Sequence, residues 1–183
     1  MSRHEHTIGV AITVPEPYGC LLQDWRRRFG DPLADAIPTH VTLLPPTQVA
    51  TDSMAGVEDH LDDVAAAERG FEMHLRGTGT FRPVSPVVFV ALALGIGDCE
   101  RIDERVRAGP LARKLPFPYH PHVTVAHDLP DAVLDGAYRD LADYEAQFPV
   151  ECFHLYEHGL DGVWRPRKEY ALGEPRQQPT PAA

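Results

Sequence analysis

Apolar residues recur along this chain with two periods, and these predict strands and helices respectively. Continuous or alternating apolar runs predict strands at 7–14, 71–75, 87–94, 151–157 and 169–172, and two further strands begin with histidines at positions 40 and 122. Apolar residues spaced three or four apart predict helices at 18–29, 52–69, 99–108 and 131–144. Pro45-Pro46 and Pro130 are expected to end the two histidine strands. The mixture of elements predicts the α+β class.

The order of these elements indicates two similar halves. Each histidine strand follows a helix, ends at proline and precedes another helix, and the two strands begin 82 residues apart, at His40 and His122. We therefore expect a pseudo-two-fold arrangement in which the two strands face a shared cleft. Residues 1–172 are predicted to form one domain. The Pro- and Gln-rich residues 173–183 are predicted to be a disordered tail.

The two histidine strands carry nearly the same tetrapeptide, His40-Val41-Thr42-Leu43 and His122-Val123-Thr124-Val125. Residues two apart in a strand point to the same face, so each segment would present an imidazole beside a hydroxyl while its apolar residues turn into the core. Two such strands brought together would form a site with two imidazoles and two hydroxyls. Such a site suits general acid–base chemistry on a phosphate ester.

Composition limits the partners that the chain can have. With 43% hydrophobic and 24% charged residues it has the composition of a globular domain, and its net charge is −10. Proteins that bind long nucleic acid tightly through many phosphates usually carry a basic face. We therefore expect a small nucleotide or an RNA-end cyclic phosphate as partner, with no tightly bound long nucleic acid and no membrane.

Cysteine usage and the absence of a long apolar run indicate where the protein resides. Cys20, Cys99 and Cys152 are odd in number and lack CxxC spacing, so we interpret them as free thiols in a reducing compartment. The first residues are too polar for a signal peptide, and no stretch approaches the roughly 20 apolar residues of a membrane helix. We expect a cytoplasmic protein, by default a monomer.

A pair of HxT[L/V] tetrapeptides about 80 residues apart resembles the signature of the 2H phosphoesterase superfamily, in particular its bacterial RNA 2′-5′ ligase/cyclic phosphodiesterase branch. The likeness runs from Ile8 to Leu172 and includes the Gly79-Thr80-Phe81 turn and the Pro121–Ala126 context of the second motif. One HxT motif alone would carry no weight, whereas two in this order of elements are specific. His127 departs from the pattern, because the family often has arginine there.

The resemblance implies a bilobal 2H fold, in which two pseudo-symmetric antiparallel sheet lobes with outer helices flank a central cleft. It also implies a site without metal or other cofactor. By position, His40 and Thr42 match the first motif, and His122 and Thr124 match the second. Family members typically hydrolyse cyclic phosphodiesters, often a 2′,3′-cyclic phosphate, and some seal or open 2′-5′ RNA linkages.

The residue types alone lead to the same chemistry. The pKa of a free histidine is about 6.5, so at neutral pH one of a pair can be neutral and the other protonated. The neutral one can take a proton from water, and the protonated one can donate to the departing ribose oxygen. Thr42 and Thr124 would donate hydrogen bonds to the phosphate oxygens. The sequence leaves open which of His40 and His122 takes which role.

Further residues are candidates for binding the substrate. Phe81 and Tyr119 flank the predicted cleft and could stack on a base, although core packing would place them equally well. Arg165, Arg167 and Lys168 form the densest basic group and could bind a phosphate, although a solvated loop would also explain them.

Other functions stay open from the sequence. His120, His122 and His127 could be read as a metal cluster, but no carboxylate or cysteine stands at a convincing position beside them. The alternative functions are RNA 2′-5′ ligation or RNA end processing, and a non-catalytic module that holds a nucleotide. Two intact motifs count against the last of these.

Overall fold

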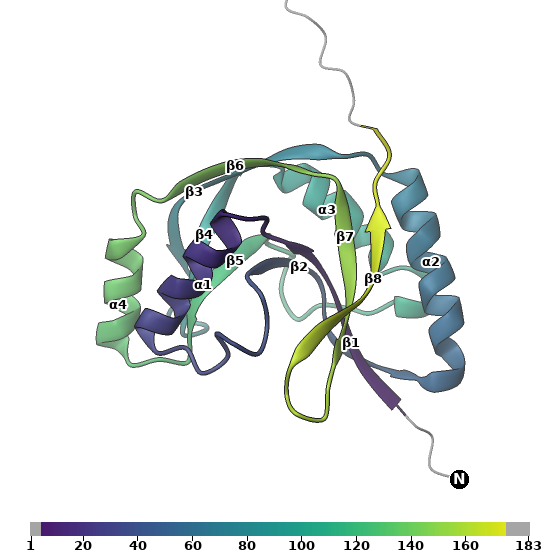
Figure 1. Cartoon of the computed structure of the whole chain (residues 1–183), viewed down its shortest axis with the longest axis horizontal. Coiled ribbons are helices and arrows are strands. Elements are labelled where there is room, and N and C mark those ends of the chain that lie inside the picture. The colour runs from purple at the N-terminus through teal and green to yellow at the C-terminus, as the bar shows by residue number, and fades with distance from the viewer. Residues whose placement is uncertain (1–4, 175–183) are drawn as a thin grey trace, which may run out of the picture.

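The computed structural model describes residues 5–174, which form one curled antiparallel sheet of eight strands with four α-helices (Figure 1). The strands are β1 (Glu5–Thr13), β2 (His40–Ala50), β3 (Phe71–Thr80), β4 (Val87–Leu94), β5 (His122–His127), β6 (Glu145–Val150), β7 (Cys152–His158) and β8 (Trp164–Ala171). The helices are α1 (Tyr18–Phe29), α2 (Met54–Ala67), α3 (Ile96–Val106) and α4 (Asp131–Asp140). The predicted α+β class is confirmed.

The strand order β6-β3-β4-β5-β2-β1-β7-β8 divides the sheet into two four-stranded lobes. One lobe runs outward from β2 and the other from β5, so each histidine strand is the innermost strand of its lobe. The two lobes pair through a single residue pair, Val41 with Val123. This is the pseudo-two-fold arrangement that the repeated motif predicts, and the bilobal fold is confirmed.

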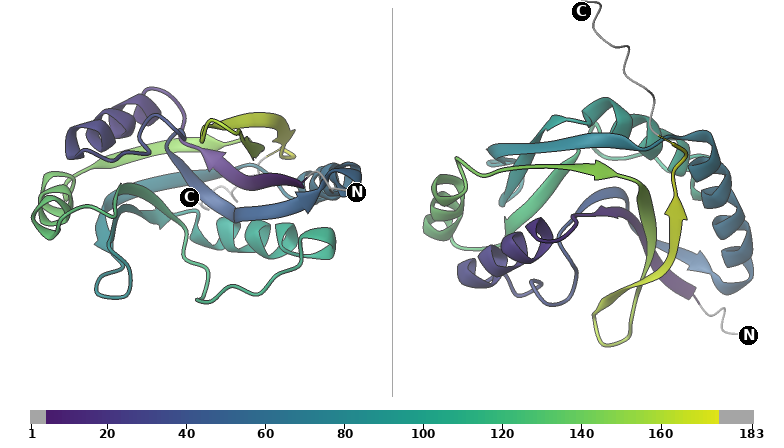
Figure 2. Two further views of the ribbon diagram at one scale, coloured as in Figure 1. Left: turned by 90° about the horizontal axis from the view of Figure 1, so that it is seen from below. Right: turned by 45° about the horizontal axis from the view of Figure 1, so that its top comes forward.

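Helices α1 and α3 each pack against the lobe opposite to the strand that they follow. Helix α1 follows β1 but packs against β5, and α3 follows β4 but packs against β2. Each histidine strand is therefore supported by a helix from the opposite half of the chain. Helix α2 lies beside β8 and α4 beside β3 and β4, at opposite ends of the sheet (Figures 1 and 2). All four helices contribute to one continuous core.

Side chains alternate between the two faces of the sheet along β2 and β5, and one of these faces is buried. Val41, Leu43, Val123 and Val125 are fully buried in that core. Their neighbours His40, Thr42, His122 and Thr124 are only partly buried, because they point to the other face of the sheet. The core residues thus fix the four motif residues on one face.

Strand β2 does not end at Pro45-Pro46 as predicted, but runs on to Ala50. The register explains why. Val10 pairs with Leu44 and Ile8 with Thr47, so the prolines fall at an irregularity in the pairing between β1 and β2. Proline lacks an N–H to donate and is tolerated in strands at such positions.

The second half of the chain contains two further corrections. Strand β6 was not predicted, since the helix was extended to residue 144 and the next strand was begun at 151. Helix α4 instead ends at Asp140, and Glu145–Val150 alternates exposed and buried residues and pairs with β3. The basic cluster is not a connecting loop either, because it lies within β8, which begins at Trp164. Strand β6 is thus formed by pairing with β3, which is distant in sequence, whereas β8 forms a hairpin with the preceding strand β7.

The predicted tail falls mostly outside the described residues. Gly173, its first residue, exchanges backbone hydrogen bonds with Glu68 and Gly70 beside the end of α2. Within residues 5–174, none of the helices combines the length and apolar composition that a membrane span requires.

We expect Val41→Ala and Val123→Ala each to lower the free energy of unfolding by about 2 kcal/mol, because each removes buried methyl groups from the junction of the lobes. Since the two side chains belong to one residue pair, the double variant should deviate from additivity by roughly 0.5 kcal/mol or more. Urea denaturation measures both effects. Val84→Ala is the matched control, since Val84 is 72% exposed. A control loss as large as the others would contradict the junction's role.

Candidate active site

The four motif residues form a compact group around the junction of the lobes. Antiparallel pairing about Val41 and Val123 sets His40 beside Thr124 and Thr42 beside His122. Opposite residues in an antiparallel pair share a face, so all four lie on the same side of the sheet. The structure therefore brings together the four residues that the sequence singles out, with each imidazole next to the hydroxyl of the other lobe.

Both histidines are held in the same way. His40 Nδ1 lies 2.7 Å from the carbonyl oxygen of Pro38, and His122 Nδ1 lies 2.7 Å from that of His120. A carbonyl oxygen can only accept, so Nδ1 is the protonated nitrogen in each ring. In the neutral state each Nε2 then carries a lone pair that can accept a proton. The same hydrogen bond from Nδ1 to a carbonyl oxygen therefore orients both rings and leaves Nε2 as the nitrogen that can exchange a proton.

The pKa values of both histidines lie below the ordinary value. Burial lowers the pKa of His40 to about 4, despite the hydrogen bond to Pro38, and the nearby Arg26 charge and His122 add to the effect. Burial also lowers the pKa of His122; the hydrogen bond to the His120 carbonyl oxygen opposes this shift and the charge of the His120 ring adds to it. Both rings are thus neutral at pH 7 before a substrate binds.

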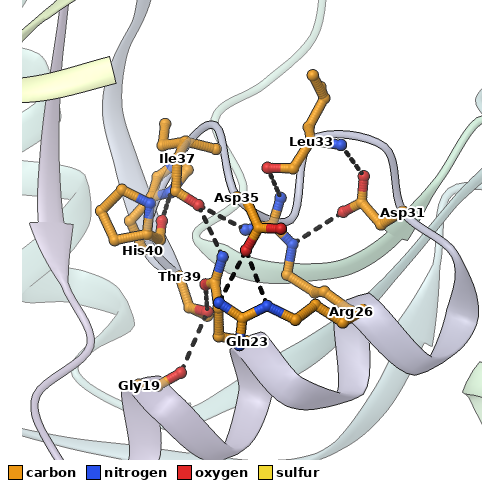
Figure 3. A network of polar contacts seen from close by, with 11 residues as sticks. Gly19, Gln23, Arg26, Asp31, Leu33, Asp35, Ile37, Thr39 and His40 are labelled. Atoms are coloured by element: carbon orange, nitrogen blue, oxygen red, sulfur yellow. Dashed lines mark hydrogen bonds and ion pairs between the residues drawn. The ribbon is translucent and has the colours of Figure 1, made fainter. Parts of the chain in front are cut away.

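The loop that precedes His40 is fastened to α1 by buried polar contacts (Figure 3). Arg26 is 4% exposed and donates through Nε to Asp31 and through its two terminal nitrogens to the carbonyl oxygens of Leu33 and Ile37, at 2.8–3.0 Å. Thr39 donates to the Gln23 side chain at 2.7 Å. These contacts set the path of residues 31–39 and so the place of His40.

The ring of His122 is held by aromatic side chains, whereas that of His40 depends on a fastened loop. The centroid of the His122 ring lies 4.8 Å from that of Phe81, edge to face, and 5.1 Å from that of Phe89. Phe89 lies over Gly79 so closely that a Cβ there would come within 2.5 Å of its ring. Glycine at this position of β3 is therefore what lets Phe89 lie against His122.

Two cavities meet at the motif residues. The smaller, of about 320 Å³, is lined by His40, Arg26, Tyr156 and Trp164. The larger, of about 640 Å³, is lined by His122 and by the apolar residues Phe81, Val84, Pro116, Phe117, Pro118 and Tyr119. Thr42, Thr124 and His127 border both cavities. The two threonines therefore stand at the centre of one cleft, with a histidine on each side.

The residues suggested for substrate binding separate into two groups. Phe81 and Tyr119 line the larger cavity, and the Tyr119 hydroxyl also donates to the Thr42 carbonyl oxygen at 2.8 Å. Arg165, Arg167 and Lys168 lie outside the lining of both cavities within residues 5–174. Each of these basic side chains is engaged by carboxylates, Arg165 by Asp161, Arg167 by Glu58 and Glu157, and Lys168 by Asp62.

Sequence reasoning missed several residues that support the site. Arg26 and Phe89 contact the parts that hold the two histidines, and Tyr156 and Trp164 line the smaller cavity. Arg26 lies on an amphipathic helix among Arg27 and Arg28, so no local signal separated it from solvent-exposed arginines. Their roles depend on contacts between segments distant in sequence.

Comparisons with known proteins identify the family of this chain. A sequence profile of the 2′-5′ RNA ligase superfamily matches residues 14–162. A Bacillus thuringiensis (strain Al Hakam) protein named "putative phosphoesterase" is 26% identical over 153 residues, which cover 81% of this chain and 87% of that protein.

Solved structures share the fold. E. coli LigT in complex with NADP⁺ superimposes with a TM-score of 0.68 at 21% identity, covering 92% of this chain and 99% of LigT. LigT in complex with 3′-AMP gives a TM-score of 0.66 at 17% identity, with the same coverage. The paired HxT motifs, the two-lobed sheet and the profile match over most of the chain agree: the chain belongs to the 2′-5′ RNA ligase superfamily of 2H phosphoesterases.

Proposed function

We propose that this protein hydrolyses a cyclic phosphodiester, such as a nucleoside 2′,3′-cyclic phosphate, without a metal ion. The observation that carries the proposal is the pair of Nδ1-tethered imidazoles on either side of two threonines at the junction of the lobes. Such a pair can both remove a proton from water and supply one to a leaving group.

In the proposed reaction, water attacks phosphorus and loses one proton to the first histidine. The bond between phosphorus and one ribose oxygen breaks, and the second histidine gives its proton to that oxygen. The product is an acyclic phosphomonoester with a free ribose hydroxyl, and proton exchange with solvent restores both rings. Thr42 and Thr124 donate hydrogen bonds to the non-bridging oxygens, where negative charge increases in the transition state.

The surroundings of the two rings favour one assignment of roles. Burial, and to a smaller extent the Arg26 charge, lower the pKa of His40 to about 4, so His40 is in the neutral form that a general base requires. His122 lacks the influence of Arg26, although burial and the neighbouring His120 lower its pKa as well. A bound phosphate anion raises the pKa of a neighbouring imidazole. We therefore assign the general acid to His122.

The larger cavity is the proposed site for the nucleobase. Its apolar and aromatic lining suits the face of a base. The E. coli LigT complexes with 3′-AMP and NADP⁺ show that a protein of this fold accommodates nucleotides. Phe81, Phe117 and Tyr119 are the proposed contacts. The basic residues of β8 are left out of this site, because their charges are paired with carboxylates outside the cavities.

A second candidate is cleavage or formation of a 2′-5′ phosphodiester linkage, which is the RNA ligase alternative. The observation in its favour is that cavities lie on both sides of the central threonines. A linear phosphodiester would need room for a group on each side of phosphorus. A 2′-5′-linked dinucleotide assayed beside the cyclic substrates separates the two functions.

His40→Ala and His122→Ala should each lower turnover of a 2′,3′-cyclic nucleotide by roughly 10²–10⁴-fold, because each removes one proton-transfer group. Thr42→Val and Thr124→Val should each lower it by roughly 10²-fold. The measurement is release of the 2′- or 3′-nucleotide from a panel of cyclic nucleotides with EDTA present.

His74→Ala is the control, since His74 pairs with Glu145 on the outer strands and should keep full activity. Activity abolished by EDTA would contradict the metal-independent mechanism. Binding of the nucleotides without turnover, in a folded protein, would identify a nucleotide-binding module instead.

The pH dependence should report the pKa values of the two histidines. Because the pKa of free His40 is about 4, the base form persists down to that pH, and kcat/KM should fall below about pH 4. The pKa of free His122 is also lowered from its ordinary value of 6.5, so the alkaline limb of kcat/KM should lie at a lower pH than that of an ordinary histidine. The alkaline limb of kcat should lie at higher pH, because bound phosphate raises the His122 pKa. Coincident alkaline limbs would contradict a rise of the His122 pKa in the substrate complex.

Phe117→Ala should raise KM for a cyclic nucleotide by roughly 5–100-fold with little change in kcat, the range expected for one lost stacking contact. Phe117 lines the larger cavity and is 63% exposed, and no ring contact joins it to His122 within the described residues. Ribose 2′,3′-cyclic phosphate, which lacks a base, is the matched substrate and should show no such change. Equal effects on both substrates would place the base elsewhere.

A further inference from the structure

A second group of chemically active side chains lies on the outer strands of the β2 lobe. Cys152 and His154 are alternate residues of β7, so they share a face, and Glu169 pairs with His154 across β7 and β8. One thiol sulfur, one imidazole nitrogen and one carboxylate oxygen lie within 4.8 Å of one another. His154 Nε2 is 3.3 Å from a Glu169 oxygen. These atoms converge on one point above the sheet.

The spacing of these atoms is close to that of a tetrahedral zinc site. Bonds of about 2.0–2.3 Å from zinc to sulfur, nitrogen and oxygen place tetrahedral ligand atoms roughly 3.3–3.8 Å apart. The His154–Glu169 separation already falls in that range. Rotation of the Cys152 and Glu169 side chains would supply the remaining shift. The backbone of the paired strands can therefore stay as it is.

The imidazole of His154 is also supported from behind. The Thr13 hydroxyl lies 3.4 Å from His154 Nδ1 and 2.6 Å from the Tyr156 hydroxyl. Histidines that bind a metal through one ring nitrogen usually have the other nitrogen held by a hydrogen-bonding group. Thr13, fixed by Tyr156, occupies that position and leaves Nε2 directed toward Glu169. This support is independent of the three converging atoms.

The site is accessible and distinct from the active site. The Glu169 side chain is 65% exposed and that of His154 19% exposed, so an ion can enter from solvent. In the sheet order, β1 separates β7 from the histidine strand β2. Tyr156 belongs to the wall of the smaller cavity, but the three ligating residues do not line either cavity within the part of the chain that the structure describes.

Cys152 is a free, partly buried cysteine, and a free thiol carries its proton at neutral pH. Binding of a divalent ion would release that proton to solvent as the metal–sulfur bond forms. Among divalent ions, a thiolate, an imidazole and a carboxylate together favour zinc over magnesium or calcium. We propose that Cys152, His154 and Glu169 bind one Zn²⁺ ion, whose fourth ligand is water.

The test uses Co²⁺ as a spectroscopic substitute for zinc, added to the full chain after dialysis against EDTA and removal of the chelator. We expect one equivalent to bind, with a thiolate-to-cobalt charge-transfer band and the intense visible bands of tetrahedral cobalt, both lost when Zn²⁺ is added. Cys152→Ser should abolish the charge-transfer band. His154→Gln and Glu169→Gln should each weaken binding by at least tenfold.

Cys20→Ser and His158→Gln are the matched controls, the first an exposed cysteine elsewhere and the second a histidine on the same strand. Both should bind cobalt as the unchanged protein does. Absence of a charge-transfer band, or its loss in Cys20→Ser instead of Cys152→Ser, would overturn the proposal. If circular dichroism shows that Cys152→Ser does not fold, the Glu169→Gln variant becomes the test, because this exposed side chain can be changed without disturbing the core. Unchanged cobalt binding by Glu169→Gln would then overturn the proposed site.

Discussion

The pairing of Val41 with Val123 is the contact on which the arrangement of the candidate active site depends. It is the point where the two lobes pair, and both valines are fully buried in the common core. Because a strand alternates its faces, burying these two residues forces the histidine and threonine on either side of each onto the opposite face. Hydrophobic burial on one side of the sheet thus determines which polar groups face the cleft on the other. A register shift by one residue would bury the imidazoles.

Two different kinds of support hold the two equivalent histidines. On the His40 side, a buried arginine and its partners fix an irregular loop, and a positive charge comes close to the ring. On the His122 side, aromatic side chains hold the imidazole, and the lack of a Cβ at Gly79 lets Phe89 pack against it. The motif and the tether to a carbonyl oxygen are the same in both halves. The surroundings differ, and this difference is what can give two identical imidazoles different roles in one reaction.

The acidic character of the chain is consistent with this site. Several arginines and the Lys168 ammonium are engaged by carboxylates on the surface of the protein, and Arg26, which lines the smaller cavity, is paired with Asp31. The cleft therefore depends mainly on hydroxyls, imidazoles and apolar walls. Such a cleft suits one small phosphate ester and offers little to a long polyanion. The proposed zinc site lies on strands remote from the motif pair, so occupancy there and turnover at the histidines can be measured separately.

The sequence by itself determined the two motifs, the repeated half, the α+β class and most elements, because these follow from short-range periodicity and from side-chain type. It also determined that His40, Thr42, His122 and Thr124 belong together, since the motif occurs twice. Only the tertiary structure decided that β2 continues through Pro45-Pro46, that Glu145–Val150 is a strand, and that the β8 cations lie outside the cleft. Strand pairing, buried ion pairs and the environment that lowers a histidine pKa all arise between segments distant in sequence, and no local pattern encodes them.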